Sequence, residues 1–441
     1  MPCSPRSPLA ALGAVGLSLA LAACGSAGSG ATGTSGAGSR GQRDLMVADA
    51  GTTPAIAAHP AAPTSAAGCR TTTLSTLAAV ARRIYFQAAH GRNGANAVVR
   101  LSRSRALADA VAAGSHRATI AALQPLLKHQ ILHITIRHGS AVVADVGHGR
   151  VMAPVHGRLY AGGRIAGTYV LSVMSPASYA GIASSVTGSS IVLRSGTHVV
   201  AAGGAAPARI PARGRAAVGG ARYRVASFSG EAFPSGPLRI FVLAGPQAFA
   251  ACDAVRPAGV TDVLGAVAVR LYNAEAHGAK VQDALRYVAR DPAYVRALTS
   301  RDRAGLANAV DHGIFKVRRL HIVRVRGQGA GGFVDDIGGP YVLAPASIAL
   351  RGPGGRDVGT ITLAVQDDTG YIKLLTRFTG GAVILRQGRT VVPGSMFDPG
   401  PASIPARGTL TYRGRRYQAY SFTGTAFPSG PLRISLLVPV A

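Results

Sequence analysis

Apolar positions along the chain follow the same sequence of patterns twice, over 74–243 and over 263–438. Each half opens with apolar residues every three or four positions, at 74–85 and at 263–272, which predicts a leading helix. Further segments with helical spacing follow at 105–113, 115–128, 280–289 and 301–311. Each half is therefore expected to begin with a group of helices.

Behind these helices the pattern becomes typical of strands, with alternating or short continuous apolar runs. In the first half the predicted strands are 131–136, 164–173, 190–194, 223–229 and 238–243, with a hairpin strand reaching 145–147. In the second half they are 320–325, 357–365, 382–386, 417–423 and 432–438, with a hairpin strand reaching 336–338. A short helix is expected near Pro176 and near Asp368. Helices followed by strands predict an α+β fold, with an antiparallel sheet of about five strands in each half.

Identical residues show that the two halves are copies. The segment AFPSGPLRI occurs at 232–240 and again at 426–434, which chance does not explain. Tyr223 and Tyr417 are 194 residues apart, whereas Tyr179 and Tyr371 are 192 apart, so two residues were inserted between these blocks. The chain is a tandem duplication. We expect two domains, 69–250 and 251–441, each of ordinary size.

The N-terminal region has the pattern of an export signal. Arg6 precedes an apolar stretch at 9–20, and Leu-Ala-Ala-Cys at 21–24 resembles the lipobox of bacterial lipoproteins. The resemblance implies a signal peptide over 1–23 and lipidation of Cys24. An ordinary cleaved signal is the alternative, and a spanning helix is disfavoured because the stretch is shorter than about 20 residues. Residues 24–68, rich in Gly, Ala, Ser, Thr and Pro, are expected to form a disordered linker.

The chain contains four cysteines, of which Cys3 lies within the signal and Cys24 at the expected anchor. Cys69 and Cys252 each precede the leading helix of their half. Leftover thiols in an oxidising compartment are usually paired, so a Cys69–Cys252 disulfide is expected, with two free or buried thiols as the alternative.

Charge and missing motifs limit the possible functions. The formal net charge of +29 favours contact with anionic lipids and anionic wall polymers. Nucleic acid is not expected as a partner of an exported protein that has no nucleic-acid-reading motif. No HExxH, GxSxG, Walker or EF-hand motif occurs, and the Asp367-Asp368 pair is replaced by Ser175-Pro176 in the first half. We therefore expect no enzyme activity, no catalytic residues, no metal and no cofactor.

Two long corresponding segments carry a resemblance to a known family. They are GRIAGTYVLSVMSPASYAGIASSVTGSSIVLRSG at 163–196 and GRDVGTITLAVQDDTGYIKLLTRFTGGAVILRQG at 355–388. With the leading helix and the Asp-x-Gly hairpin, they resemble PAS-like extracytoplasmic sensor domains of the Cache type. The resemblance implies a tandem pair of such domains in a bacterial lipoprotein.

The resemblance implies that a ligand binds as it does in Cache domains, between the inner face of the sheet and the loop and helix that cover it. The candidate ligand-binding residues are hydroxyl-bearing side chains at the corresponding positions: Tyr169, Ser172, Tyr179, Tyr223, Ser227, Thr362, Tyr371, Tyr417 and Ser421. Tyrosine offers an apolar body and a hydroxyl donor, which suits a small polar metabolite. The alternative is that the Tyr179/Tyr371 and Tyr223/Tyr417 pairs complete the core of each copy.

The function expected from the sequence is that of a lipid-anchored protein on the outer face of the cell membrane. It would bind a small molecule and report the binding to a separate membrane signalling partner. The rival is an envelope-associated structural or adhesion protein that docks anionic wall polymers or lipids and has no ligand pocket.

Overall fold

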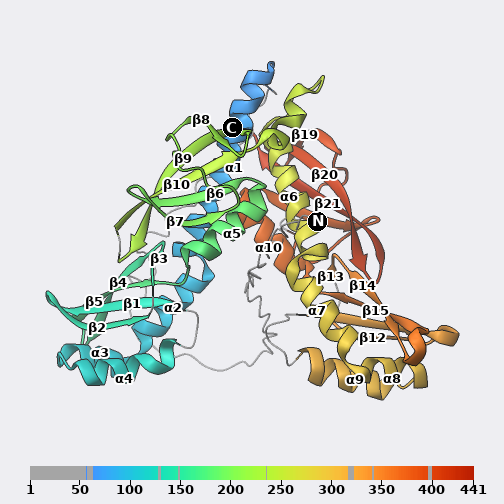
Figure 1. Cartoon of the computed structure of the whole chain (residues 1–441), viewed down its shortest axis with the longest axis horizontal. Helices are drawn as coiled ribbons and strands as arrows, with labels where there is room; N and C mark the ends of the chain where they lie inside the picture. The colour runs from blue at the N-terminus through green and yellow to red at the C-terminus, as the bar shows by residue number, and fades with distance from the viewer. Residues whose placement is uncertain are drawn as a thin grey trace, which may run out of the picture.

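The computed structural model describes residues 56, 63–127, 131–147, 149–234, 236–315, 322–339, 342–395 and 400–441. The expected signal peptide, Cys24 and most of the expected linker lie outside the described residues. Within the described residues, the two halves lie side by side and repeat the same order of helices and strands (Figure 1).

The first half begins with helices that split between its two sheets. They are α1 (Ala66–His90), α2 (Arg92–Arg103), α3 (Arg105–Ala112) and α4 (His116–Leu127). Ser65 caps α1, because its Oγ accepts a hydrogen bond from the Gly68 N–H at 3.1 Å. The α1 residues Leu77, Val80 and Ile84 are buried on the face toward the core.

The strands of the first half form two antiparallel sheets. One has the order β2 (Ala141–Gly147), β1 (His133–His138), β5 (Arg164–Ser172) and β4 (Val155–Ala161). The other has the order β3 (Val151–Met152), β9 (Ala221–Phe233), β10 (Gly236–Ala244), β6 (Ser190–Ser195) and β7 (His198–Gly203), and β8 (Gly214–Val218) pairs with β9. Helices α2 to α4 contact the first sheet, whereas α1 and α5 (Pro176–Thr187) contact the second.

The second half repeats this plan. Its helices are α6 (Val260–His277), α7 (Ala279–Arg290), α8 (Pro292–Ser300), α9 (Arg303–Val310), the π-helical η4 (Asp311–Phe315) and α10 (Asp368–Thr379). One sheet has the order β12 (Val334–Gly338), β11 (Arg324–Gly329), β15 (Asp357–Ala364) and β14 (Ala346–Arg351). The other has the order β16 (Gln366–Asp367), β13 (Val342–Leu343), β20 (Arg415–Phe427), β21 (Gly430–Pro439), β17 (Ala382–Gln387) and β18 (Thr390–Val391), and β19 (Arg407–Tyr412) pairs with β20.

The α+β class with antiparallel sheets is confirmed, and the same arrangement is repeated in the two halves. The structure adds that the strands of each half are divided between two sheets. The strand expected at 320–325 is displaced, since β11 runs from Arg324 to Gly329. The pattern of apolar residues did not predict this strand correctly, because Gly327 has no side chain at a buried position of the strand. A Cβ at Gly327 would lie 2.6 Å from Leu306 Cδ2, so the neighbouring leucine occupies the space of the missing side chain.

The two halves share a hydrophobic cluster where they meet. Helix α1 contacts α6 and α10, and α6 contacts α5, so each half's helices pack against those of the other (Figure 1). Residues of α1, α5, α6 and α10 belong to the same buried cluster. None of the described helices is both long and apolar enough to cross a membrane.

A covalent bond and an ion pair fix the start of α1 to the 3₁₀ helix η3 (Pro246–Asp253), which spans the expected domain boundary. The structure contains the disulfide expected from the sequence, with the Sγ atoms of Cys69 and Cys252 1.98 Å apart. Beside it, Arg70 Nη2 lies 2.6 Å from Asp253 Oδ1. The beginning of the first half is thus held at the junction with the second.

Candidate functional site

The residues predicted to bind a ligand in the first half lie in separate parts of the fold. Tyr169 belongs to the core of the first sheet, and burial raises the pKa of its hydroxyl to about 12. Ser172 is buried and donates its hydroxyl hydrogen to the Met152 carbonyl. Tyr179 is fully buried and donates to the Ala81 carbonyl of α1 at 2.9 Å. Tyr223 packs at the apolar cluster on the other face of the second sheet, and Ser227 donates to the Ala212 carbonyl at 2.8 Å.

The second half distributes its candidates in the same way. Thr362 and Ser347 share a hydrogen bond of 2.7 Å between their hydroxyls across β14 and β15. Tyr371 is fully buried and donates to the Ala268 carbonyl of α6 at 2.9 Å, as Tyr179 does in the first half. Tyr417 lies in a small buried cluster. The Ser421 hydroxyl donates a hydrogen bond to the Pro405 carbonyl and shares another with the Ser435 hydroxyl.

The structure therefore does not bring these nine residues together at one cavity, and a ligand role for them stays a prediction. Their placement agrees with the alternative in which Tyr179 and Tyr371 complete the core. Each tyrosine joins the short helix of its half to the leading helix through a buried hydrogen bond, so it fixes the packing of those two elements.

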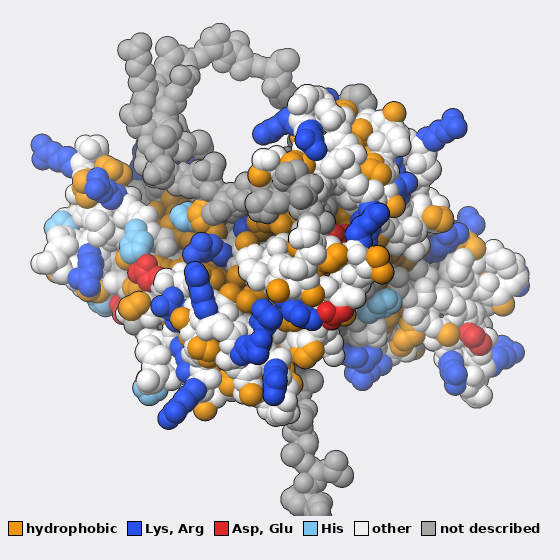
Figure 2. All heavy atoms as spheres, turned by 90° about the horizontal axis from the view of Figure 1, so that it is seen from above, with side chains coloured by type: hydrophobic (Ala, Val, Ile, Leu, Met, Phe, Trp, Pro, Cys, Tyr) orange, Lys and Arg blue, Asp and Glu red, His pale blue; other side chains and the backbone are white. Residues whose placement is uncertain are grey.

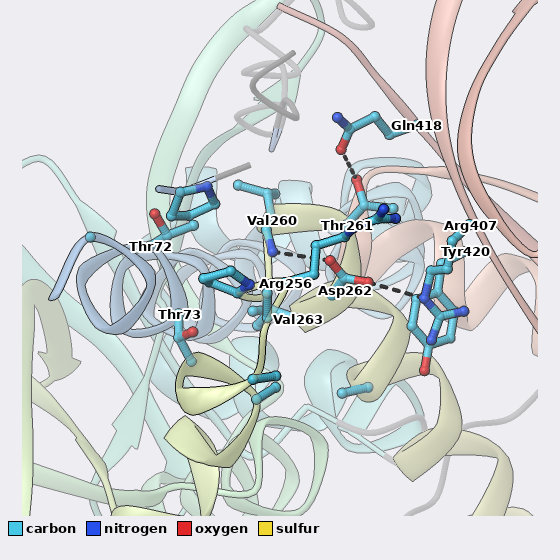
Figure 3. Close-up of a pocket in the computed structure, with 18 of the residues that line it drawn as sticks. Thr72, Thr73, Arg256, Val260, Thr261, Asp262, Val263, Arg407, Gln418 and Tyr420 are labelled. Carbon is cyan, nitrogen blue, oxygen red and sulfur yellow. Dashed lines mark hydrogen bonds and ion pairs between the residues drawn. The ribbon is translucent and has the colours of Figure 1, made fainter. Parts of the chain in front are cut away.

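A cleft of about 840 Å³ lies elsewhere, between the two halves. It is lined by the chain before and along α1, by η3 and the loop after it, by the first turns of α6, and by β19 and β20 (Figure 3). Just over half of its lining residues are apolar and mostly small, with alanines at 248, 251, 254, 258, 266 and 419. The other lining residues are polar or charged, and a concave site that mixes the two kinds suits a small polar molecule.

One wall of the cleft is an ordered stack of three side chains (Figure 3). The Tyr420 ring lies against α6 at Gly265, where a Cβ would come within 2.2 Å of the ring. On its other side the Arg407 guanidinium lies 3.3 Å from the ring centroid, a cation–π contact. Arg407 Nε donates to Asp262 Oδ1 at 3.1 Å, and Asp262 Oδ2 accepts from the Gly259 N–H at 3.0 Å. The start of α6 thus holds the stack in place.

Hydroxyl groups supply further polar lining. Thr261 is buried and donates to Gln418 Oε1 at 3.1 Å, which joins α6 to β20 (Figure 3). Thr72 and Thr73 approach from α1, and Thr73 Oγ1 lies 3.7 Å from Cys252 Sγ. The disulfide therefore stands directly behind the lining and fixes the two halves where the cleft forms.

Three arginines line the cleft, and they differ in how they are held. Arg407 is engaged by Asp262 and Tyr420. Arg256 is exposed, and no acidic partner faces it within the described residues. Arg270 is half-buried, and burial lowers the pKa of its guanidinium. Its Nη1 is buried without a hydrogen-bond partner among the described residues.

Sequence reasoning did not single out these cleft residues. One signal existed, because the halves differ at these positions: Asp262 and Tyr420 correspond to Ser75 and Ala226. The alignment of α1 with α6 follows from the buried tyrosine hydrogen bonds, because the Ala81 carbonyl accepts from Tyr179 as the Ala268 carbonyl accepts from Tyr371. Among the described residues, no group of three His, Cys, Asp or Glu side chains forms a metal site.

Comparison with known proteins gives few leads. No family model matches the chain, and no curated protein matches it. Among solved structures, it is similar to the ligand-binding domain of the Pseudomonas fluorescens chemoreceptor CtaA in complex with L-serine. That match has 12% identity, a TM-score of 0.24, and coverage of 40% of this chain and 98% of the other. An extracellular ligand binding receptor from Desulfohalobium retbaense DSM5692 matches with 14% identity, a TM-score of 0.25, and coverage of 49% of this chain and 45% of the other. At these TM-scores the likeness assigns neither a fold nor a ligand to this chain.

Proposed function

We propose that this protein binds a small molecule outside the cytoplasm, in the cleft between its two halves, and reports the binding to a separate membrane partner. The cleft is the observation that supports this proposal. Its volume of about 840 Å³ falls in the range of small-molecule sites, about 300–1,000 Å³. Its position between the halves gives a bound molecule contacts with both, so binding would affect how they are held together.

The proposal includes attachment to the outer face of the membrane through Cys24. Its support is the signal-like sequence at 9–24. Intact-mass measurement of protein extracted from membranes tests it. A mass increase from diacylglycerol, absent in Cys24→Ser, is expected, and an unmodified N-terminus would refute the anchor.

A second candidate function rests on the surface charge. Lys and Arg side chains are spread over the face shown in Figure 2, with few Asp and Glu between them, in keeping with the net charge of +29. Such a surface attracts anionic wall polymers and lipids at low salt. In this alternative the protein docks to the envelope, and no small molecule occupies the cleft.

A thermal-shift screen of the full chain against amino acids, dicarboxylates, sugars, purines and polyamines at moderate salt separates the two functions. A ligand stabilises the folded state by mass action, so binding raises the melting temperature in a saturable way. The rise should disappear in Ala251→Phe, which fills the cleft from η3. It should persist in Ala217→Phe, which changes an exposed alanine of β8 outside the cleft. Absence of any saturable stabiliser, together with salt-sensitive retention on anionic polymers, would favour the docking function.

A further inference from the structure

Positively charged side chains outnumber negatively charged ones in the lining of the cleft. Its ionisable side chains other than Tyr420 are Arg256, Arg270, Arg407 and Asp262. Asp262 is paired with Arg407. Two guanidinium groups are thus left without an acidic partner in the described part of the chain. A guanidinium cannot lose its charge at physiological pH, so partial burial makes an anionic partner favourable.

Arg270 differs from its counterpart in the first half in a way that bears on ligand binding. Its counterpart Arg83 reaches the end of α10 in the other half, where its Nε donates to the Arg377 carbonyl at 3.0 Å. Arg270 lies at the matching end of α5, where a Cβ on Gly188 would be 2.7 Å from its Nε. No carbonyl there accepts from it, and its Nη1 stays buried without a partner among the described residues. Arg83 completes a helix contact, whereas the guanidinium of Arg270, a residue that lines the cleft, has no acceptor among the described residues.

We propose that the cleft binds a small anion, a molecule with a carboxylate or phosphate group, and that Arg270 is its principal contact. This inference rests on the proposed function and specifies its ligand class. The fork of N–H donors on a guanidinium matches the paired oxygens of either group. Arg256, exposed at the cleft, adds a second positive charge. In the stack of Asp262, Arg407 and Tyr420, the charges of Asp262 and Arg407 are paired with each other. The anion is therefore expected to contact Arg270 and Arg256.

Calorimetric titration of the full chain with succinate and with inorganic phosphate, at ionic strength held constant with chloride, tests this inference. The two probes distinguish a carboxylate from a phosphate ligand. We expect saturable binding of one probe, weakened about tenfold or more in Arg270→Gln and less in Arg270→Lys, which keeps the charge and loses the fork. Circular dichroism establishes that both variants are folded. The matched control is Arg213→Gln, an exposed arginine that corresponds to Arg407 but lies outside the cleft.

Each contrary outcome has a distinct meaning. Equal weakening in Arg270→Gln and Arg213→Gln would show a general effect of the positive charge and would overturn the Arg270 site. Failure of both anions, alongside a neutral compound whose stabilisation is lost in Ala251→Phe, would overturn the anionic ligand class and leave the proposed function standing. Failure of both anions and of every compound in the thermal-shift screen would overturn both.

Discussion

The two halves have the same framework, but they differ where they meet. Tyr179 and Tyr371 make the same buried hydrogen bond, each to the leading helix of its own half. The leading helices differ at equivalent positions, where Leu74 and Ser75 of α1 correspond to Thr261 and Asp262 in the first turn of α6. Only the second set takes part in the polar lining of the cleft. The two copies have kept the same core contacts. Their residues at the junction have diverged, and the polar stack that lines the cleft comes from the second half alone.

Ionisable groups inside the second half show the same divergence. Ala88 and Pro176 of the first half correspond to Glu275 and Asp368 of the second. Burial raises the pKa of the Glu275 carboxyl, and Lys280 lowers it in part. Asp368 is 1% exposed, and its Oδ1 has no hydrogen-bond partner among the described residues. The second half thus carries a half-buried carboxyl, Glu275, and a buried one, Asp368, where the first half is apolar.

Loss of the disulfide should have the largest effect, because this bond fixes the junction that both halves share. Replacing both Cys69 and Cys252 by serine removes a cross-link between residues 183 apart in sequence. We expect the free energy of unfolding to fall by about 3–5 kcal/mol. Urea denaturation of the variant and of the wild-type protein measures the change. A loss below about 1 kcal/mol would mean that the shared core alone holds the junction.

Asp368→Asn should abolish a pH dependence that belongs to the second half alone. Burial first, and the neighbouring Asp367 second, raise the pKa of Asp368 from 3.8 to about 7. The folded protein therefore keeps this proton at pH values where the unfolded chain has lost it. The stabilisation is fully present below about pH 4 and is lost as the pH rises through about 7. The neutral amide does not titrate, so the variant should be more stable than wild type at pH 8, by about 2–4 kcal/mol.

Urea denaturation at pH 5 and pH 8 measures the difference between the Asp368 variant and the wild-type protein. Asp109→Asn is the matched control, since Asp109 is exposed on α3. A gain toward pH 8 that appeared equally in this control would point to a general effect of removing a negative charge. An Asp368→Asn difference that does not grow toward pH 8 would contradict a raised pKa.

Gly265→Ala tests the stack that distinguishes the second half. The added Cβ would lie 2.2 Å from the Tyr420 ring, so the ring and Arg407 must move, at a cost of about 1–3 kcal/mol. The first half has alanine at both corresponding positions, Ala78 and Ala226. The double variant Gly265→Ala/Tyr420→Ala copies that pair and should recover part of the lost stability. A double-mutant cycle by thermal unfolding measures the coupling, and strictly additive losses would contradict the predicted clash.

The sequence predicted the repeated framework well because the framework depends on local patterns. The spacing of apolar residues in α1 and α6, and the paired tyrosines of the short helices, occur in both copies. The division into two sheets was hidden, since β3 has only two residues and β4 contains Gly157, whose missing side chain leaves room for Tyr169. The cleft could not be predicted at all. Its walls come from segments between residues 63 and 420, and they meet only once the halves are placed against each other.

The smallest expected effect distinguishes the two junction arginines by a matched pair of glycine variants. Gly188 and Gly380 end α5 and α10 with φ of +66° and +73°. Alanine at either position should cost about 1–2 kcal/mol of stability in thermal unfolding, because this left-handed conformation disfavours a Cβ. The added Cβ would approach Arg270 in one variant and Arg83 in the other. Only Gly188→Ala should therefore weaken anion binding in the calorimetric titration. Equal weakening by both variants would mean that the helix ends act through general packing, with no special part for Arg270.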